Sequence, residues 1–262
     1  MGFLASLHGV RAAHPGEATG TLYVRIQGPR VSISLDTSGD HLHRRGYRPE
    51  RAEAPVRENL AAGLIRRAGW KGGEAFLDPL CGSGTLAVEA ALLGMGRAPG
   101  LHRSFGFEAF PSFRTERWVG LKEGAEEAAK PSPPAPVFAS DRDAAAVEQT
   151  ARTARRAGVA DHVEVACCPV EELEAPAPTG LVVANPPYGR RLGGAGSALR
   201  ALGGALAGRL GGWRWAVVLP SPRTPWGAEA KGAHAFTNGG LRRWLVLGGP
   251  PESVGRAVGE GT

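Results

Sequence analysis

The sequence predicts an α/β fold built on a mostly parallel, doubly wound sheet, and three observations support this fold class. Short apolar strands alternate with helices between residues 75 and 220. A glycine-rich loop, CGSGT, joins the first of these strands to the helix that follows it. Near the end of the chain, two apolar runs flank Asn238-Gly239, which is a hairpin signal. Alternating strands and helices followed by a hairpin predict a parallel sheet with one reversed strand.

The first third of the chain contains a predicted hairpin, a connector and a helix. Residues 21–35, TLYVRIQGPRVSISL, read as two strands around a Gly-Pro turn. Apolar residues alternate with serines in the second strand, so we expect one face of this hairpin to be buried. A polar and strongly basic connector follows. Residues 55–69, PVRENLAAGLIRRAG, predict a helix that has a proline at its start and a glycine near its end.

Five predicted strands and the helices between them form the main sheet. The strands are AFLDPL (75–80), VFASD (137–141), HVEVACC (162–168), GLVVAN (180–185) and WRWAVVLP (213–220). The helices between them are expected at 85–96, at 143–159 and near 197–210. An aromatic-rich insertion, residues 99–130, separates the first helix from the second strand. We expect its aromatic residues to be core rather than platforms for bases; they are Phe105, Phe107, Phe110, Phe113 and Trp118.

Composition limits the classes of function. The net charge of +6 and the pI of about 9.7 permit an acidic partner such as RNA, although the excess of Arg, Ala, Gly and Pro also fits a GC-rich genome. The three cysteines form neither a disulfide framework nor a zinc spacing, so no metal site is expected. No run of apolar residues is long enough to span a membrane, and no secretion signal is apparent. We therefore expect a cytoplasmic protein.

The loop after the first strand of the main sheet carries the first functional pattern. DPLCGSGT places Asp78 at the end of that strand and Gly82 and Gly84 before a helix that begins at Thr85. Glycines let the backbone approach a ligand closely, and a helix N-terminus favours a negative group such as a carboxylate. An acid at the strand tip would repel a pyrophosphate but suits an α-ammonium group, as in S-adenosylmethionine. The second strand ends at Asp141, where it could bind ribose hydroxyls. For the loop alone, a tight structural turn is the alternative.

The fourth strand of the main sheet ends abruptly in Asn185-Pro186-Pro187-Tyr188. An exocyclic amine is a poor nucleophile because its lone pair is delocalised into the ring. It improves when acceptors hold both N–H bonds, here the side-chain oxygen of Asn185 and the carbonyl of Pro186. The prolines fix these acceptors in place, and Tyr188 offers a face on which a flipped base would stack, for about 1–3 kcal/mol. The pattern predicts methyl transfer to a planar amine or amide, and a proline-terminated strand without chemistry is the alternative.

Taken together, these stretches resemble the RNA guanine-N2 methyltransferases that carry an N-terminal THUMP domain, the 23S rRNA and tRNA enzymes. The matching stretches are SLDTSGDHLHRRGYR (34–48), APVRENLAAGLI (54–65), FLDPLCGSGTLAVEAAL (76–92), APGLHRSFGFEAFPSF (98–113), ASDRD (139–143) and NPPYGRRL (185–192). The first and fourth of these are the most specific, because other amino-methyltransferases usually lack them.

The resemblance implies a class I S-adenosylmethionine-dependent methyltransferase, with a Rossmann-like, seven-stranded, doubly wound sheet and one antiparallel strand. It implies S-adenosyl-L-methionine as the cofactor, bound by Asp78, Cys81, Gly82, Ser83, Gly84, Thr85, Asp141 and Asp143. It also implies that Asn185, Pro186, Pro187 and Tyr188 form the catalytic motif. Where the family has an acid that contacts the adenine amine, this chain has Pro169.

The resemblance further implies a domain organisation. Residues 1–37 would be a remnant of a THUMP-like RNA-binding domain, residues 38–73 a basic connector and helix, and residues 74–256 the methyltransferase domain. Two basic clusters are candidate RNA contacts: Arg44, Arg45 and Arg48 around Tyr47, and Arg190 with Arg191 after the catalytic motif. A solvated linker and an ordinary basic turn are the respective alternatives.

The expected activity is methyl transfer from S-adenosylmethionine to the exocyclic N2 amine of a guanine in structured RNA, either rRNA or tRNA. The same amide-proline geometry also serves an adenine-N6 methyltransferase or a protein-glutamine methyltransferase. A third hypothesis is a degenerate, non-catalytic RNA-binding relative, because the cofactor-binding acid is replaced by Pro169.

Overall fold

The computed structural model describes residues 20–47, 56–187 and 195–250, and the chain divides into two compact units. Unit 1 combines residues 1–46 with 98–128, and unit 2 combines residues 47–97 with 129–262. The aromatic insertion, which the sequence predicts inside the domain 74–256, therefore clusters with the N-terminal segment. In the described part of the chain, no helix has both the length and the apolar character needed to cross a membrane.

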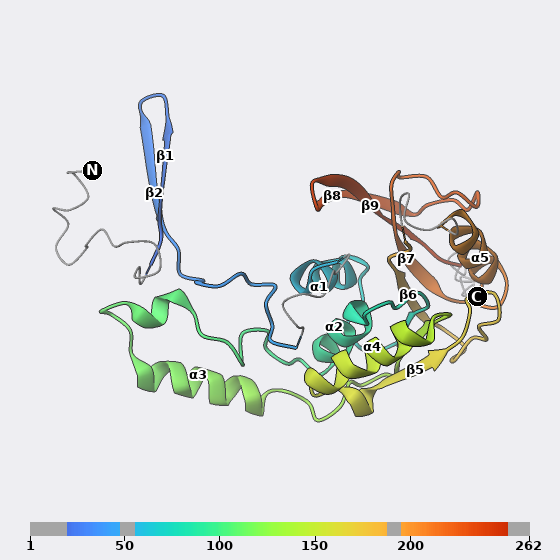
Figure 1. Ribbon diagram of the computed structural model, residues 1–262, viewed down its shortest axis with the longest axis horizontal. Helices are drawn as coiled ribbons and strands as arrows, with labels where there is room; N and C mark the ends of the chain where they lie inside the picture. The colour runs from blue at the N-terminus through green and yellow to red at the C-terminus, as the bar shows by residue number, and fades with distance from the viewer. Residues whose placement is uncertain (1–19, 48–55, 188–194, 251–262) are drawn as a thin grey trace, which may run out of the picture. The chain divides into compact units, whose positions relative to one another are not determined.

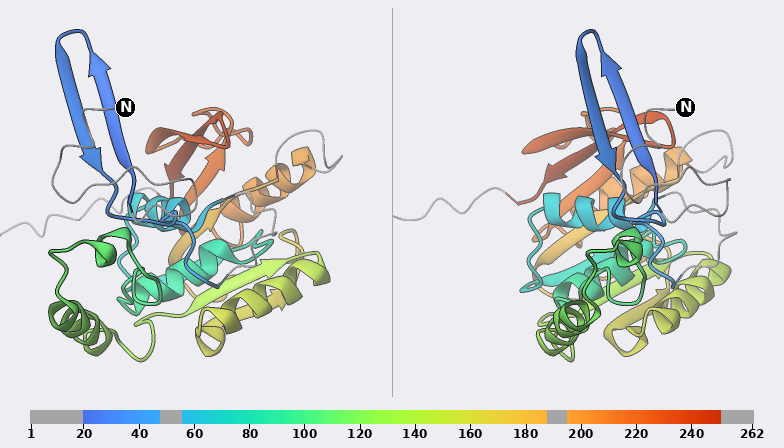
Figure 2. Two further views of the ribbon diagram at one scale, coloured as in Figure 1. Left: turned by 60° about the vertical axis from the view of Figure 1, so that its left-hand side comes forward. Right: turned by 90° about the vertical axis from the view of Figure 1, so that its left-hand side faces the viewer.

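Unit 1 consists of a β-hairpin and a helical segment. Strands β1 (Leu22–Gln27) and β2 (Arg30–Leu35) pair antiparallel around a tight turn, as predicted, and both views in Figure 2 show them as a two-stranded ribbon. The insertion contributes a 3-10 turn, Gly106–Ala109, and the helix α3 (Thr115–Glu127).

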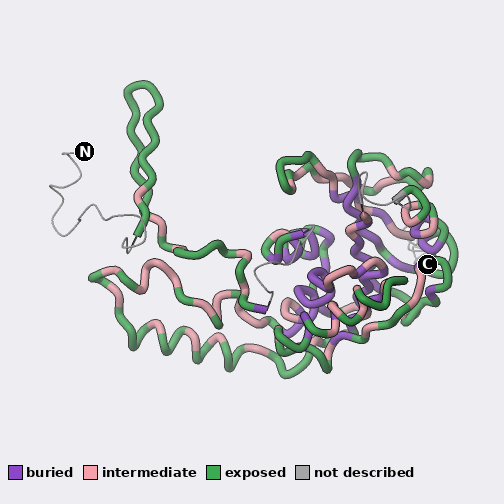
Figure 3. Tube along the Cα trace, viewed as in Figure 1, coloured by how far each residue is buried: buried purple, intermediate pink, exposed green. Residues whose placement is uncertain are grey.

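The predicted burial of one hairpin face is wrong. The register places six apolar side chains on one face, in the pairs Leu22 with Leu35, Val24 with Ile33 and Ile26 with Val31. The alternation is therefore real, but Val31, Ile33 and Leu35 are 57%, 58% and 49% exposed. Figure 3 shows the hairpin as almost continuously exposed. Within the described residues of unit 1, nothing covers this face.

Unit 2 contains the predicted doubly wound sheet. Its described residues form seven strands in the order β5-β4-β3-β6-β7-β9-β8, in which only β9 runs against its neighbours (Figure 1). The strands are β3 (Ala75–Asp78), β4 (Val137–Asp141), β5 (Val163–Cys167), β6 (Gly180–Ala184), β7 (Arg214–Leu219), β8 (Gly232–Asn238) and β9 (Leu241–Gly248). The predicted fold class is confirmed.

Helices cover both faces of this sheet. Helices α1 (Glu58–Arg67), α2 (Thr85–Gly94) and α4 (Ala144–Arg156) share one apolar core, and α5 (Ala195–Ala207) contributes to a second. Strand β3 shows why: Phe76 belongs to the first core, and its neighbours Ala75 and Leu77 belong to the second. Successive strand residues point to opposite faces, so an almost wholly apolar strand needs cover on both sides.

The hairpin near the C-terminal end forms one residue later than the sequence indicated. Asn238 pairs with Leu241, so the two-residue turn is Gly239-Gly240 rather than a turn centred on Asn238-Gly239. Both glycines have positive φ, 57° and 77°. A two-residue turn with two positive φ angles matches the twist of the flanking strands and favours glycine at both positions.

Candidate active site

The carboxyl edge of the sheet brings the predicted site residues together. Strands β4, β3 and β6 are parallel neighbours, with Asp78 paired to Ala139 on one side and Leu77 paired to Val182 on the other. Asp78, Asp141 and Asn185 each stand at or just beyond the end of one of these strands. Ligands bind at this edge in open α/β sheets, where the chain order of the strands reverses.

The two loop glycines have different surroundings, although both have positive φ. Gly84 (φ 78°) is the N-cap of α2, and a Cβ there would lie 2.7 Å from Cγ2 of Thr150. Gly82 (φ 53°) would direct a Cβ into space with no atom within 4 Å. Gly84 therefore allows α4 to pack against the loop, whereas Gly82 leaves room for a ligand to approach the backbone.

A contact between Thr150 of α4 and Cys81 holds the glycine loop in place. The hydroxyl of Thr150, which is fully buried, donates to Sγ of Cys81 at 3.3 Å or to the carbonyl of Gly82 at 3.0 Å. Burial, together with the charge of Asp78, raises the pKa of the Cys81 thiol above its usual range. A neutral thiol is a poor nucleophile, so Cys81 is not suited to nucleophilic catalysis in this loop.

Asp78 is a buried acid that has little compensation from the protein. It is 1% exposed, and burial raises its pKa from 3.8 to about 8, with a further contribution from the charge of Asp141. A hydrogen bond from the backbone N–H of Leu80, at 3.4 Å, opposes this rise. No cationic side chain among the described residues pairs with Asp78. A positively charged group of a ligand could therefore form an ion pair with this carboxylate.

Asp141 and Asp143 differ in what they contact. The carboxylate of Asp141 accepts from the backbone N–H of Gly82 at 3.0 Å and from that of Asp143 at 3.1 Å, which ties the tip of β4 to the glycine loop. Asp143 is the N-cap of α4 and accepts from the backbone N–H of Ala145 at 2.9 Å. The structure therefore gives Asp143 a helix-capping position, in addition to its predicted place at the cofactor.

Ser83 and Thr85 complete the loop. Their hydroxyl oxygens lie 3.4 Å apart, and Thr85 is the buried first residue of α2. The backbone N–H of Cys81 donates to the carbonyl of Ser140 at 2.9 Å, so β4 fixes the start of the loop. The N-terminus of α2 and the acids at the strand tips thus face the same edge of the sheet.

The predicted catalytic segment follows β6 at this edge. Asn185 and Pro187 are half-buried, and Pro186 is buried. Within the described residues, the side-chain amide of Asn185 makes no hydrogen bond to the protein. Among these residues, no donor therefore competes for its oxygen. Tyr188, Arg190 and Arg191 lie outside the described residues, and so does Arg48.

The basic cluster that surrounds Tyr47 in the sequence is divided in the structure. Arg44 and Arg45 belong to unit 1, where Arg44 pairs with Asp40 at 3.6 Å on the surface. Tyr47 belongs to unit 2, is 4% exposed and donates its hydroxyl to Glu89 of α2 at 2.6 Å. Tyr47 is therefore part of the core of unit 2, and RNA contact by the arginines around it stays a prediction.

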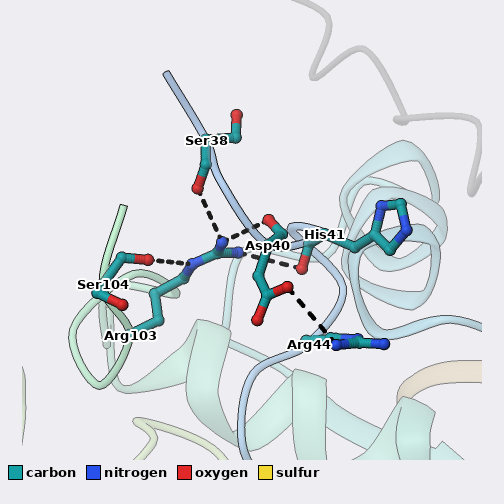
Figure 4. A network of polar contacts seen from close by, with 6 residues as sticks. All are labelled: Ser38, Asp40, His41, Arg44, Arg103 and Ser104. Carbon is teal, nitrogen blue, oxygen red and sulfur yellow. Dashed lines mark hydrogen bonds and ion pairs between the residues drawn. The ribbon is translucent and has the colours of Figure 1, made fainter. Parts of the chain in front are cut away.

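Arg103 is a residue of unit 1 that the sequence analysis missed. Its guanidinium donates to the carbonyls of His41 at 3.1 Å, Ser38 at 3.1 Å and Asp40 at 2.5 Å (Figure 4). It also lies over the ring of Phe105, 4.8 Å from the centroid. One side chain of the insertion therefore fixes the shape of the loop that leads into Arg44 and Arg45.

Comparison with known proteins gives one family and several related structures. The model of the UPF0020 family, RMKL-like methyltransferase domain, matches residues 45–218. Among solved structures, SMU.472 complexed with SAH is 29% identical, with a TM-score of 0.80 over 88% of this chain and 62% of that one. A possible methylase from Clostridium difficile 630 is 32% identical, with a TM-score of 0.79 over 88% and 62%. A predicted N6-adenine-specific DNA methylase from Listeria monocytogenes is 32% identical, with a TM-score of 0.76 over 87% and 60%. The chain thus spans about three fifths of these related proteins.

Proposed function

The chain belongs to the UPF0020 family of RMKL-like methyltransferase domains, and we propose that it transfers a methyl group from S-adenosylmethionine to the N2 amine of a guanine in structured RNA. The observation that carries the proposal is the meeting of the glycine loop, the acids of β3 and β4, and the Asn185-Pro186 segment at one edge of the sheet. The SAH bound to the related SMU.472 supports the choice of cofactor, because SAH is what remains after methyl transfer.

The residues at this edge fit the cofactor. Asp78 is a buried acid without a cation among the described residues, and the α-ammonium of S-adenosylmethionine would supply one. The open space beyond Gly82 admits the methionine part close to the backbone. Asp141 lies at the tip of the neighbouring strand and would bind the ribose hydroxyls. When bound, the cofactor supplies a methyl group on a positively charged sulfur.

The Asn185-Pro186 segment would hold the nucleophile. The amide oxygen of Asn185 and the carbonyl of Pro186 accept the two N–H bonds of an exocyclic amine, which localises the lone pair on nitrogen and directs it toward the methyl group. The amine nitrogen would form its new bond to the methyl carbon that the cofactor supplies as the carbon–sulfur bond breaks, and it would then lose a proton to solvent. Asn185 is half-buried, Pro186 is buried, and the two prolines restrict the backbone. The acceptors would therefore be positioned before the substrate binds.

The choice of guanine in RNA rests on the segments 34–48 and 98–113 and on the net charge of +6. These segments resemble those of the THUMP-associated RNA enzymes, and other amino-methyltransferases that share the Asn-Pro-Pro-Tyr motif usually lack them. A positive protein gains affinity for RNA through phosphate contacts and the release of counterions. We propose RNA as the partner and Arg44, Arg45, Arg48, Arg190 and Arg191 as its phosphate contacts.

Methyl transfer can be tested directly with labelled S-adenosylmethionine and total RNA that lacks the modification. We expect the label in N2-methylguanosine after digestion of the RNA to nucleosides. A parallel reaction uses DNA as the substrate. Label found only in N6-methyladenine, with DNA methylated better than RNA, would overturn the choice of guanine in RNA. Label in protein and not in nucleic acid would point to the glutamine alternative.

The part played by Asn185 can be tested separately. Asn185→Ala should retain cofactor binding by calorimetry and lose about 10²-fold or more of kcat, because one positioned acceptor is removed. Asn185→Asp keeps an oxygen acceptor and serves as the matched variant, with an intermediate rate. Unchanged turnover of Asn185→Ala would rule out the assigned mechanism even if the enzyme methylates RNA.

A further inference from the structure

Unit 1 contains an aromatic pocket that the proposed reaction does not use. The pocket has a volume of about 290 Å³ and is lined mainly by Phe107, Phe110, Phe113 and Trp118, with Arg114 and Arg117 at its rim. All of these residues belong to the insertion, and α3 supplies one wall. The volume is at the lower end of the range for small-molecule sites, which suits a ligand the size of a single base.

The aromatic cluster is not a core, contrary to the expectation from the sequence. Phe105, Phe107, Phe110, Phe113 and Trp118 are all only half-buried, and unit 1 has no buried residue among those described. Phe107 contacts three of the other rings: it stacks on Phe105 at 5.3 Å, meets Trp118 edge to face at 5.0 Å and lies at a tilt to Phe113 at 6.0 Å, centroid to centroid. In the described part of the chain, the buried indole N–H of Trp118 has no acceptor. In a well-packed core, a buried indole N–H normally donates to an acceptor. The open cluster is therefore more typical of a binding site than of a core.

The charges around the pocket favour an anionic occupant. Arg114 and Arg117 are exposed, and neither pairs with a carboxylate of the described residues. Arg114 is the N-cap of α3 and Arg117 lies in its first turn, whereas Glu126 and Glu127 occupy the last turn. The acidic last turn is unfavourable for the helix dipole, and in the first turn Glu116 stands beside Arg117, so the two arginines are not needed to stabilise the helix. The arginines are therefore better explained by a negative ligand than by the stability of the helix.

We propose that this pocket binds an unpaired nucleotide of the RNA, with the base against the aromatic rings and its phosphate at Arg114 and Arg117. The proposal rests on the proposed function, since it identifies the RNA feature that the chain captures as a single-stranded or flipped-out nucleotide. Aromatic rings bind splayed bases by stacking, and guanidinium groups bind phosphates in a bidentate manner. An apolar protein segment would use the rings but leave both arginines without a partner.

The test is the affinity for a short, fluorescently labelled oligouridylate, which remains unpaired, measured by anisotropy at several salt concentrations. Arg117→Glu should weaken binding about tenfold and reduce the slope of log affinity against log salt by about one. Arg156→Glu, at the far end of α4 and away from the carboxyl edge, is the charge-matched control and should bind like the wild type. Equal affinities of the two variants would overturn the proposal.

The aromatic wall needs an independent measurement, because a ring variant could disturb unit 1. Crosslinking of 4-thiouridine oligonucleotide to the wild-type chain should give modified peptides that contain Phe113 or Trp118. Phe113→Ala should weaken oligouridylate binding by about tenfold. Crosslinks confined to other peptides would refute the pocket. So would a change of molecular mass on light scattering for Phe113→Ala without a change in oligouridylate affinity, since that result identifies a protein contact. None of these readouts depends on methyl transfer, so they remain informative if the proposed reaction is wrong.

Discussion

Gly82 and Gly84 offer the sharpest test of how the glycine loop is built. Both have positive φ, 53° and 78°, so alanine at either position costs about 1–2 kcal/mol of backbone strain. The environments differ. At Gly84 the new Cβ would lie 2.7 Å from Cγ2 and 2.9 Å from Oγ1 of Thr150, whereas at Gly82 no atom lies within 4 Å.

The contact with Thr150 adds an overpacking term at Gly84 only. Such a term is typically about 1–3 kcal/mol, so Gly84→Ala should lower the free energy of unfolding by about 2–5 kcal/mol and Gly82→Ala by about 1–2 kcal/mol. Thr150→Ala removes both clashing atoms, together with the hydrogen bonds to Cys81 and Gly82. In a double-mutant cycle, Gly84→Ala should therefore cost about 1–3 kcal/mol less in the Thr150→Ala background.

Urea denaturation measures the stability terms, and calorimetry with S-adenosylmethionine measures binding. Gly82→Ala should fold but bind the cofactor at least about tenfold more weakly, because its Cβ enters the space proposed for the ligand. If Gly84→Ala proved no more destabilising than Gly82→Ala, the packing argument would fail. If Gly82→Ala bound the cofactor like the wild type, the proposed position of the cofactor would be wrong.

Three further predictions follow from buried or networked groups. Burial raises the pKa of Asp78 from 3.8 to about 8, so between these pH values the folded chain holds a proton that the unfolded chain releases. The contribution of this proton to the free energy of unfolding is complete below pH 3.8 and is lost as the pH rises through 8. Asp78→Asn should flatten this decline in thermal melts between pH 5 and 9 and should also weaken cofactor binding; an unaltered pH profile would contradict the raised pKa. Tyr47→Phe removes a 2.6 Å hydrogen bond to Glu89 and should cost about 1.5–3 kcal/mol in urea denaturation, with a loss below about 0.5 kcal/mol counting against a strong bond. Arg103→Lys cannot reach all three carbonyls, so amides 38–41 should exchange hydrogen faster; unchanged protection would show that the loop holds its shape without the guanidinium.

The sheet could be predicted because its signals are local. VFASD, at 137–141, begins with three apolar residues and stands between a proline-rich linker and a helix, and it forms β4 with the same bounds. The hairpin at the start of the described chain shows the limit of such signals. Alternation in residues 31–35 correctly predicted that Val31, Ile33 and Leu35 share a face, but burial also needs an element that covers the face. The pattern of one strand carries no information about that second element.

The site could be predicted in part for a related reason. The shared position of Asp78, Asp141 and Asn185 could be predicted because each stands at, or directly after, the end of an apolar strand, and parallel strands bring their ends to the same edge. Thr150 and Arg103 were missed because they act across 69 and 63 residues of sequence, on Cys81 and on Asp40. One feature of the sequence could have identified Thr150. A threonine on the apolar face of a predicted helix is expected to be buried, and a buried hydroxyl needs a hydrogen-bond partner.

We expect the two acids at the glycine loop to bind different groups of the cofactor, because the protein satisfies their hydrogen-bonding capacity to different extents. Asp141 accepts two backbone N–H groups at 3.0 and 3.1 Å, so its position is fixed before any ligand is present. Asp78 receives one longer hydrogen bond at 3.4 Å and is nearly excluded from water. A carboxylate held in a fixed position by hydrogen bonds suits neutral hydroxyl groups, because binding a hydroxyl group depends on the orientation of the acceptor more than on its charge. A buried acid with a raised pKa suits an ammonium group, because that cation provides the compensation that water and the protein do not. The same argument explains why the acid at the tip of β3 is expected to couple ligand binding to pH.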